Sequence, residues 1–307
     1  MIWRMFCRRL LEGAAVALMA VVLLVLPMAV QAAAEAYLGQ MPPGSAPRLF
    51  APGIVSVAAN FEHSAAVFSP DGRELFWCTN VNHRTDPPGE GLRLYQMRLL
   101  GGAWTEPEIA SFTQGIGVPV ERPVFSPDGE RLFIEFSRDP NAESDTQIYV
   151  VGREGEGWSE PAPASPRINS RAYERIHCIT PDGSMIFSRD LMTAREKVFM
   201  SRWVDGAFAE PEQLGAPFDS DAHELAIVMA PDEAFLLVAL TRTGREDELY
   251  ISYREPDGGW TERIRTPYQC GGFLALSPDG AYLFFLGEGI YWVDTSFVDR
   301  LRPEHLR

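Results

Sequence analysis

A short turn sequence recurs five times along the chain and limits what the chain can fold into. In its clearest form it reads Val-Phe-Ser-Pro-Asp-Gly, followed within a few residues by an aliphatic–aromatic pair such as Leu75-Phe76. Proline presets φ for a tight turn, Asp hydrogen-bonds the nearby backbone and Gly supplies a left-handed residue, so the pattern predicts a β-hairpin turn. Because the Asp recurs in every repeat, we interpret it as a turn residue and not as a catalytic group. The turn prolines are Pro70, Pro127, Pro181, Pro231 and Pro278.

Each repeat continues in a similar way after its turn. A second strand leads through a variable loop to a third strand marked by a pair such as Ile148-Tyr149, and a Gly-containing turn precedes a fourth segment such as Trp158-Ser159-Glu160-Pro161. We expect this last segment to be an edge strand, where proline is tolerated. Successive turn prolines lie 57, 54, 50 and 47 residues apart. Four antiparallel strands in about fifty residues predict an all-β fold, a single β-propeller of four-stranded blades.

The fifth repeat stops after its third strand, at Ile290-Tyr291-Trp292-Val293. A matching outer segment lies at the other end, because residues 46–53 resemble residues 211–217 at the exit of another repeat. We therefore expect the N-terminal segment to supply the outer strand of the last blade and to close the ring. The propeller would span residues 35–300 with five blades, six being the alternative, and residues 301–307 would form a polar tail.

The N-terminal region has the features of an export signal. Arg4, Arg8 and Arg9 precede an apolar run over residues 14–30, and small residues offer cleavage sites near Ala32 and Ala34. This pattern predicts a signal peptide of the Sec type over residues 1–34 and a periplasmic or secreted protein. The alternative is an uncleaved N-terminal membrane anchor, since the run approaches spanning length.

The net charge of −15 argues against binding to a phosphate backbone, so we expect no nucleic-acid partner. Cys7 would leave with the signal peptide. Cys78, Cys178 and Cys270 remain and permit at most one bridge. Cys78 and Cys178 lie in apolar strand patterns, which favours buried free thiols over a disulfide framework. We expect a monomer with no membrane span after cleavage.

The Ser-Pro-Asp-Gly turn, the following Leu-Phe strand and the Leu/Ile-Tyr strand resemble the Pro-Asp subclass of WD-like repeats, as found in the propeller of TolB and of prolyl-oligopeptidase-like peptidases. The resemblance covers nearly the whole chain after residue 34 and implies a TolB-like propeller. It does not extend to the N-terminal α/β domain of TolB, for which the chain has no room, and the five repeats differ from the six blades of TolB. The Gly-x-Ser-x-Gly elbow of the peptidases is missing from the sequence, so a serine peptidase is not expected.

Polar residues gather where the innermost strand of each blade should begin, at the mouth of the central channel. Three of the five histidines lie in this zone beside carboxylates. His and carboxylate side chains together can bind a divalent metal, so His63, His177 and His223 are candidate metal ligands. The alternative is a polar channel holding water and ion pairs between blades. The ligand-binding candidates are Glu62, His63, Glu121, Arg122, Glu174, Arg175, His177, His223 and Glu224.

Two functional hypotheses follow. The first is a non-enzymatic binding or scaffold module of the cell envelope, with an envelope protein or a small polar or carbohydrate ligand as its partner and with no cofactor. The second is a metal-dependent carbohydrate lyase or hydrolase that uses the channel histidines. The recurrence of Trp104, Trp158 and Trp260 at one repeat position favours packing over sugar stacking.

Overall fold

The computed structural model describes residues 36–81, 91–137, 146–190, 196–218, 224–241 and 247–307. The chain divides into two compact units, Met1–Pro42 and Pro43–Arg307. In the described part of the first unit, the Gln40 amide donates a hydrogen bond of 3.0 Å to the Tyr37 carbonyl and closes a single turn. The second unit contains every strand that the structure describes.

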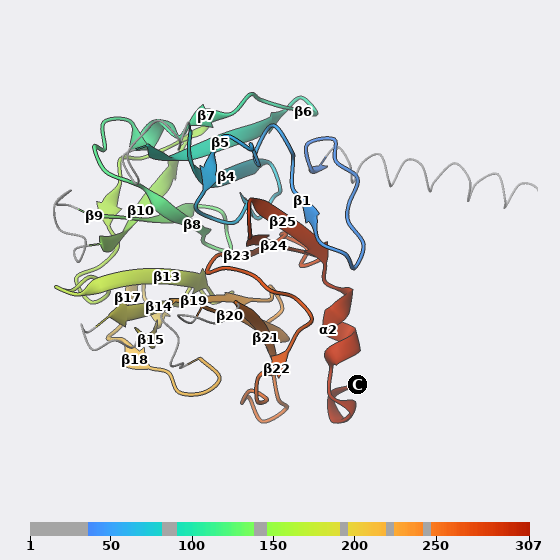
Figure 1. Cartoon of the computed structure of the whole chain (residues 1–307). Coiled ribbons are helices and arrows are strands. Elements are labelled where there is room, and N and C mark those ends of the chain that lie inside the picture. Colours follow the sequence, from blue (N-terminus) through green and yellow to red (C-terminus); the bar gives the residue numbers. More distant parts are fainter. Residues whose placement is uncertain (1–35, 82–90, 138–145, 191–195, 219–223, 242–246) are drawn as a thin grey trace, which may run out of the picture. The chain divides into compact units, whose positions relative to one another are not determined.

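The second unit is a five-bladed β-propeller of antiparallel sheets, as the repeats predict (Figure 1). The innermost strands are β3 (Val67–Phe68), β8 (Glu121–Phe125), β13 (Tyr173–Ile179), β19 (Glu224–Met229) and β23 (Leu274–Leu276). The second strands are β4 (Glu74–Asn80), β9 (Arg131–Ser137), β14 (Met185–Asp190), β20 (Phe235–Thr241) and β24 (Tyr282–Leu286). The third strands are β5 (Leu92–Leu100), β10 (Thr146–Glu154), β15 (Glu196–Ser201), β21 (Glu248–Tyr253) and β25 (Ile290–Asp294). The outer strands are β7 (Glu108–Ile109), β12 (Ala162–Pro163), β18 (Glu212–Gln213), β22 (Ile264–Arg265) and β1 (Arg48–Leu49).

The Pro-Asp turns join the first two strands of each blade and use their aspartates as predicted. In the second blade, Asp128 Oδ1 accepts hydrogen bonds from the Ser126 hydroxyl and the Glu130 amide, and the Gly129 amide donates to the Ser126 carbonyl at 2.9 Å. Gly129 has a φ of 73°, in the left-handed region that glycine tolerates best. The carboxylate is therefore occupied by the turn itself.

The turn of the fourth blade lacks the glycine found in the other four turns. Glu233 stands where the other turns have Gly and has a φ of 57°. A side chain in this conformation costs about 1 kcal/mol or more. Glu233→Gly should therefore raise the free energy of unfolding by roughly 1 kcal/mol, because the 3.7 Å pair that Glu233 makes with Arg254 is half-exposed and contributes little. Urea denaturation measures this change, with Gly280→Ala at a φ of 70° as the converse variant, which should be destabilised. A less stable Glu233→Gly protein would contradict the assignment of strain.

The ring is closed by the N-terminal strand. β1 pairs antiparallel with β25, placing Arg48 opposite Trp292. The Ser56 hydroxyl donates to the Ile290 carbonyl at 3.2 Å and accepts from the Ile290 amide at 3.1 Å. Phe50 is fully buried against the rings of Phe68, Phe284 and Trp292. The last blade thus contains strands from both ends of the unit, as the sequence predicts.

The predicted edge strand lies a few residues later than expected. The Trp segments β6 (Ala103–Trp104) and β11 (Gly157–Trp158) pair near the end of the third strand, and β17 (Ala207–Phe208) pairs with the short strand β16 (Trp203–Val204) that follows it. In these three blades the outer strands begin after Glu-Pro. The large rings pack between blades instead, since Trp158 contacts Phe76 of the preceding blade at 6.4 Å between ring centroids. Packing between blades therefore decides where the aromatic side chain sits.

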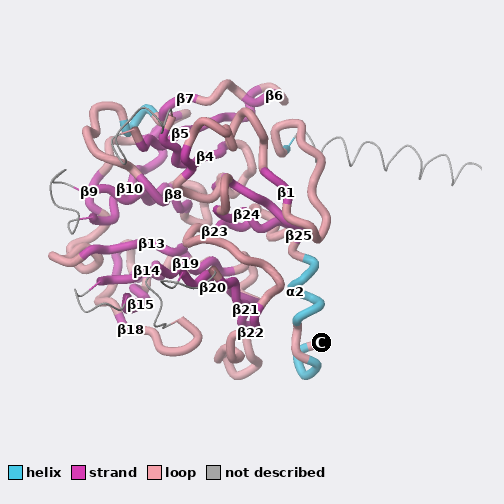
Figure 2. The backbone as a smooth tube through the Cα atoms, in the orientation of Figure 1, coloured by secondary structure: helices cyan, strands magenta, loops and turns pink. Residues whose placement is uncertain are grey.

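The C-terminal segment packs against the propeller, whereas the sequence predicted a polar tail over residues 301–307. Helix α2 (Ser296–Leu301) buries Phe297 and Val298, and Leu301 and Leu306 pack against the core of the last two blades. Figure 2 shows that this helix follows β25 directly. Two apolar residues spaced along a short segment were too weak a signal for the sequence to predict this packing.

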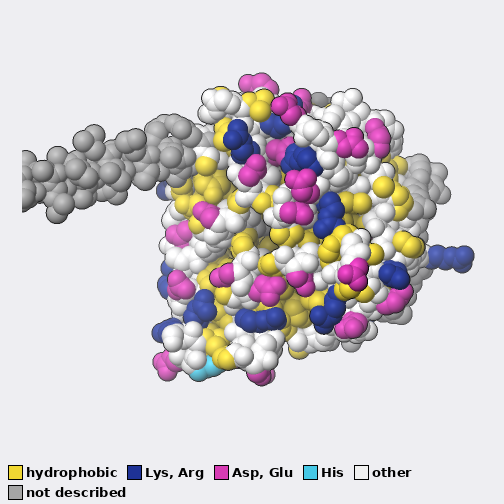
Figure 3. Space-filling view, turned by 180° about the vertical axis from the view of Figure 1, so that it is seen from behind, with side chains coloured by type: hydrophobic (Ala, Val, Ile, Leu, Met, Phe, Trp, Pro, Cys, Tyr) yellow, Lys and Arg dark blue, Asp and Glu magenta, His cyan; other side chains and the backbone are white. Residues whose placement is uncertain are grey.

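The three cysteines in the described part of the chain are buried free thiols, which confirms the prediction for Cys78 and Cys178 and adds Cys270. Burial raises the pKa of Cys178 to about 12, so this thiol is not a ready nucleophile. No helix among the described residues is long and apolar enough to cross a membrane. On the face shown in Figure 3, acidic and basic side chains are interspersed and do not gather into one basic surface.

Candidate functional site

The site is built around an irregularity in β8. The pairing of β8 with β9 shifts register between Glu121 and Val124, and Arg122 within this bulge has a φ of 49°. A left-handed conformation is unfavourable for a residue with a side chain and persists where the surrounding structure enforces it. The bulge breaks the alternation of side chains along the strand, and the Arg122 side chain lines the central cavity.

Arg122 is buried with few partners. Its Nη1 donates to the Gly272 carbonyl at 3.2 Å, and its guanidinium carbon lies 4.1 Å from the ring centroid of Phe273. Its Nε lies 3.6 Å from Glu135 Oε2 and makes no hydrogen bond within the described part of the chain. A buried guanidinium with free donors is a position where an acceptor would bind favourably.

Glu135 is the carboxylate that faces this arginine from β9. It is fully buried, and its Oε1 accepts a hydrogen bond from the Ile176 amide. Burial raises the pKa of Glu135 to about 8, although the charges of Arg122 and Arg175 act in the opposite direction. Near neutral pH this carboxyl is therefore mostly protonated and does not neutralise the arginines.

Glu121 and His63 form a pair at the same end of the channel. His63 Nδ1 lies 3.3 Å from Glu121 Oε2, and the His63 ring contacts Phe273 at 4.9 Å between centroids. Burial acts to raise the pKa of Glu121, but the neighbouring His63 and the charges of Arg122 and Arg175 bring it below its usual value. Glu121 is consequently an ionised carboxylate.

His177 on β13 lies deeper in the channel. It is 7% exposed, and neither of its ring nitrogens has a hydrogen-bond partner among the described residues. Burial, together with the charges of Arg122 and Arg175, holds the pKa of His177 well below its usual value. The side chain is therefore a neutral imidazole with one unused donor and one unused acceptor.

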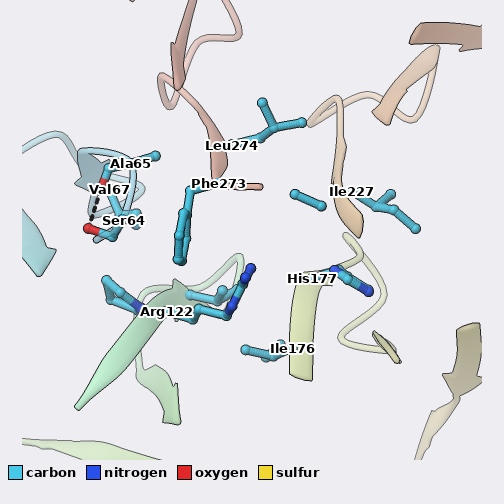
Figure 4. Close-up of a pocket in the computed structure, with 12 residues that line it drawn as sticks. Ser64, Ala65, Val67, Arg122, Ile176, His177, Ile227, Phe273 and Leu274 are labelled. Carbon is cyan, nitrogen blue, oxygen red and sulfur yellow. Dashed lines mark hydrogen bonds between the residues drawn. The ribbon is translucent and has the colours of Figure 1, made fainter. Parts of the chain in front are cut away.

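Two adjoining cavities occupy the channel. The narrower, of about 30 Å³, is lined by Arg122, His177 and Phe273 among others, and Figure 4 shows Arg122 beside Phe273 with His177 to one side of them. The wider, of about 250 Å³, which we call the funnel, opens among the Pro-Asp turns. The two share five lining residues, so they are continuous. The shared residues are Val67, Pro123, Val124, His177 and Leu274.

The remaining predicted site residues either have partners close by in the sequence or lie outside the part of the chain that the structure describes. Glu62 accepts from the Val57 amide at 3.0 Å, and Glu174 pairs with Arg189 at 3.1 Å. Burial raises the pKa of both carboxyls. Arg175 lies 5.3 Å from the Tyr173 ring centroid. Glu224 begins β19 but its side chain is not among those described, and His223 lies outside the described residues.

The arrangement brings Arg122, Glu135, Arg175, His177 and Phe273 together, and we refer to these five residues as the channel site. Glu135 and Phe273 were not predicted. A signal for Glu135 existed, because it stands eight residues after its turn proline, where the other blades carry Cys78, Arg189, Ala239 and Leu286. Among the five residues at this repeat position, Glu135 is the only acidic one, so an alignment of the repeats could have predicted it.

Metal binding by the histidines is not supported by the side chains that are described. Among these, no group of three or more His, Cys, Asp or Glu side chains is placed to hold a metal ion. His63 is engaged with Glu121, and the third candidate, His223, is outside the described residues.

No known protein-family model matches this sequence, and no curated protein sequence matches it either. A protein of unknown function from Dyadobacter fermentans has a similar structure, with a TM-score of 0.50 and 14% identity over 82% of this chain and 83% of that one. TolB from Acinetobacter baumannii gives a TM-score of 0.45 at 14% identity, over 77% of this chain and 55% of TolB. A TolB candidate from Agrobacterium tumefaciens gives 0.47 at 22% identity, over 72% and 68%. The chain thus spans about half the length of the Acinetobacter protein, and the similarity at these identities concerns the propeller fold alone.

Proposed function

We propose that the protein is an exported, non-enzymatic binding module of the cell envelope that takes up a small molecule in its central channel. The observation that carries the proposal is His177, a buried imidazole with two unused polar atoms facing a cavity. A buried polar group without a partner costs about 1–3 kcal/mol. A ligand that hydrogen-bonds it recovers this free energy on binding.

The channel site can bind a polar ligand through Arg122 and His177. The Pro-Asp carboxylates are used in turns, and the thiols of Cys178 and Cys270 are buried with raised pKa values, so neither group supplies a ready nucleophile. The space beside Arg122 and His177 is small and enclosed, which favours a small molecule over the surface of a folded partner.

Replacement of His177 tests this proposal. His177→Leu should raise the free energy of unfolding by about 1–3 kcal/mol, because it removes an unpaired buried polar group, and should abolish ligand binding. The measurement is a thermal-shift screen of small sugars, amino acids, carboxylates and peptides, followed by calorimetry on the compounds that bind. His305→Leu is the matched control, since His305 is exposed on the chain end, and it should retain binding.

Ligands that bind the His177→Leu and wild-type proteins equally would contradict the proposal. Turnover of a bound compound, or a stoichiometric metal lost on replacing His63 or His177, would instead favour the lyase or hydrolase hypothesis.

A further inference from the structure

The chemistry of the two cavities differs, and their order along the channel is informative. The narrow cavity contains the cationic Arg122 and neutral His177. The funnel is lined chiefly by aliphatic side chains and the five turn prolines. A molecule that occupies both must therefore be polar at one end and apolar at the other.

The charge balance at the narrow end favours an anion. Arg122 is a buried cation, and Glu135, the carboxyl that lies 3.6 Å from its Nε, is mostly neutral near pH 7. Among the described side chains, the ionised Glu121 is paired with His63, so Arg122 keeps a positive charge that an anion can neutralise. Electrostatic attraction is strong in a buried site because the effective dielectric is low.

The geometry of Arg122 suits a carboxylate. Nη1 is bound to the Gly272 carbonyl, and within the described part of the chain this is the only hydrogen bond of the guanidinium. Its remaining N–H groups can bind a carboxylate, and the His177 ring can donate a further hydrogen bond from its protonated nitrogen. The Phe273 ring covers the guanidinium at 4.1 Å and fixes its plane.

The volume of the funnel limits the size of the ligand's apolar part. A dry apolar cavity of about 150 Å³ holds a benzene molecule. The funnel, at about 250 Å³, therefore has room for a larger but still compact body.

We infer that the ligand is a monocarboxylic acid with a compact apolar body, whose carboxylate binds Arg122 and His177 and whose body fills the funnel. This inference rests on the proposed function and names the chemical class of its ligand. An aromatic acid and a medium-chain aliphatic acid share this chemistry.

Calorimetry with octanoate, octanamide and acetate at pH 7 tests the inference on the full chain. Octanoate should bind with a stoichiometry of one and at least tenfold more tightly than octanamide, which lacks the charge, or acetate, which lacks the body. Arg122→Gln should weaken octanoate binding at least tenfold and weaken octanamide binding less, because octanamide loses a neutral hydrogen bond and no charge attraction. Val228→Phe, which narrows the funnel, should weaken octanoate more than butyrate and provides an independent test if Arg122→Gln does not fold.

The charge of Glu135 gives a further readout. Raising the pH from 7 to 9 should weaken octanoate binding, because Glu135 ionises beside Arg122 while the probe stays charged. The groups that face Glu135 are Glu121 and Arg122 from β8, Tyr173 and Arg175 from β13 and the Cys78 thiol from β4, and β10 places the uncharged Ile148 opposite it. Burial raises the pKa of Cys78, so this thiol stays neutral at pH 9. Glu121 is already ionised, and burial raises the pKa of Tyr173 above its usual value. Glu135→Gln should remove this pH dependence.

Equal affinities for octanoate and octanamide, or octanoate binding that neither variant changes, would overturn the inference. If neither octanoate nor any other apolar monocarboxylate binds, but another small compound binds in a His177-dependent manner, the inference fails and the proposed function stands. If no compound binds in that manner, both fail.

Discussion

Phe50→Ala is expected to lower the free energy of unfolding by about 3–5 kcal/mol, the range for truncating a fully buried phenylalanine. Phe50 follows the closing strand β1 and contacts Phe68 of the first blade and Phe284 and Trp292 of the last blade. The substitution therefore leaves a cavity at the seam where the ring closes. Urea denaturation followed by tryptophan fluorescence measures the loss.

Phe61→Ala is the matched control, because Phe61 also lies near the start of the first blade but is 46% exposed. Its truncation should change the free energy of unfolding by less than about 1 kcal/mol. Equal losses in the two variants would show that the seam has no special dependence on Phe50.

Glu135 should make the protein less stable as the pH rises. Its folded pKa of about 8 lies above the ordinary 4.5, so the folded state holds its proton more tightly than the unfolded state. The resulting stabilisation is fully present below pH 4.5 and is lost as the pH rises through 8. We expect a fall of roughly 2 kcal/mol or more in the free energy of unfolding between pH 5 and pH 8. Glu62 and Glu174, whose pKa values are also raised, add to this fall with the same sign.

Glu135→Gln should flatten this dependence. At pH 5 both proteins carry a neutral side chain at position 135 and should have similar stability, whereas at pH 8 the variant should be the more stable. Urea midpoints at several pH values measure the difference, and Glu160→Gln on the exposed surface should retain the wild-type slope. If the free energy of unfolding fell equally with pH in the wild type and in Glu135→Gln, the result would contradict a raised pKa for Glu135.

The sequence predicted the blades and the closing strand because their signals are local and repeated. A Pro-Asp-Gly turn specifies a hairpin wherever it occurs, and Glu233 shows that the other signals of the repeat suffice when the glycine is missing. The aromatic segments were misplaced because Trp158 and its equivalents are positioned by rings of the neighbouring blade, which no local pattern records.

The channel site could be predicted only in part. Arg122 and His177 were found because polar residues are unusual at the start of an inner strand. The bulge that turns Arg122 into the cavity depends on how β8 meets β9, and a register shift leaves no mark in the sequence. Glu135 was not predicted because it lies in a largely apolar strand. Its contacts with Arg122 of β8 and Ile176 of β13 depend on how the blades pack, which the sequence of β9 does not show.

The pairing of β1 with β25 also has a consequence for the order of folding. Ser56 and Ile290 are hydrogen-bonded across 234 residues of sequence, so the first strand synthesised finds its partner only when the last strand is complete. Contacts between such distant residues slow folding because a long loop must be ordered first. The ring therefore stays open until residues 290–294 are available to pair with β1. A chain truncated before Ile290 should accordingly remain sensitive to protease along its first blade, whereas the full chain should become resistant in a single late step.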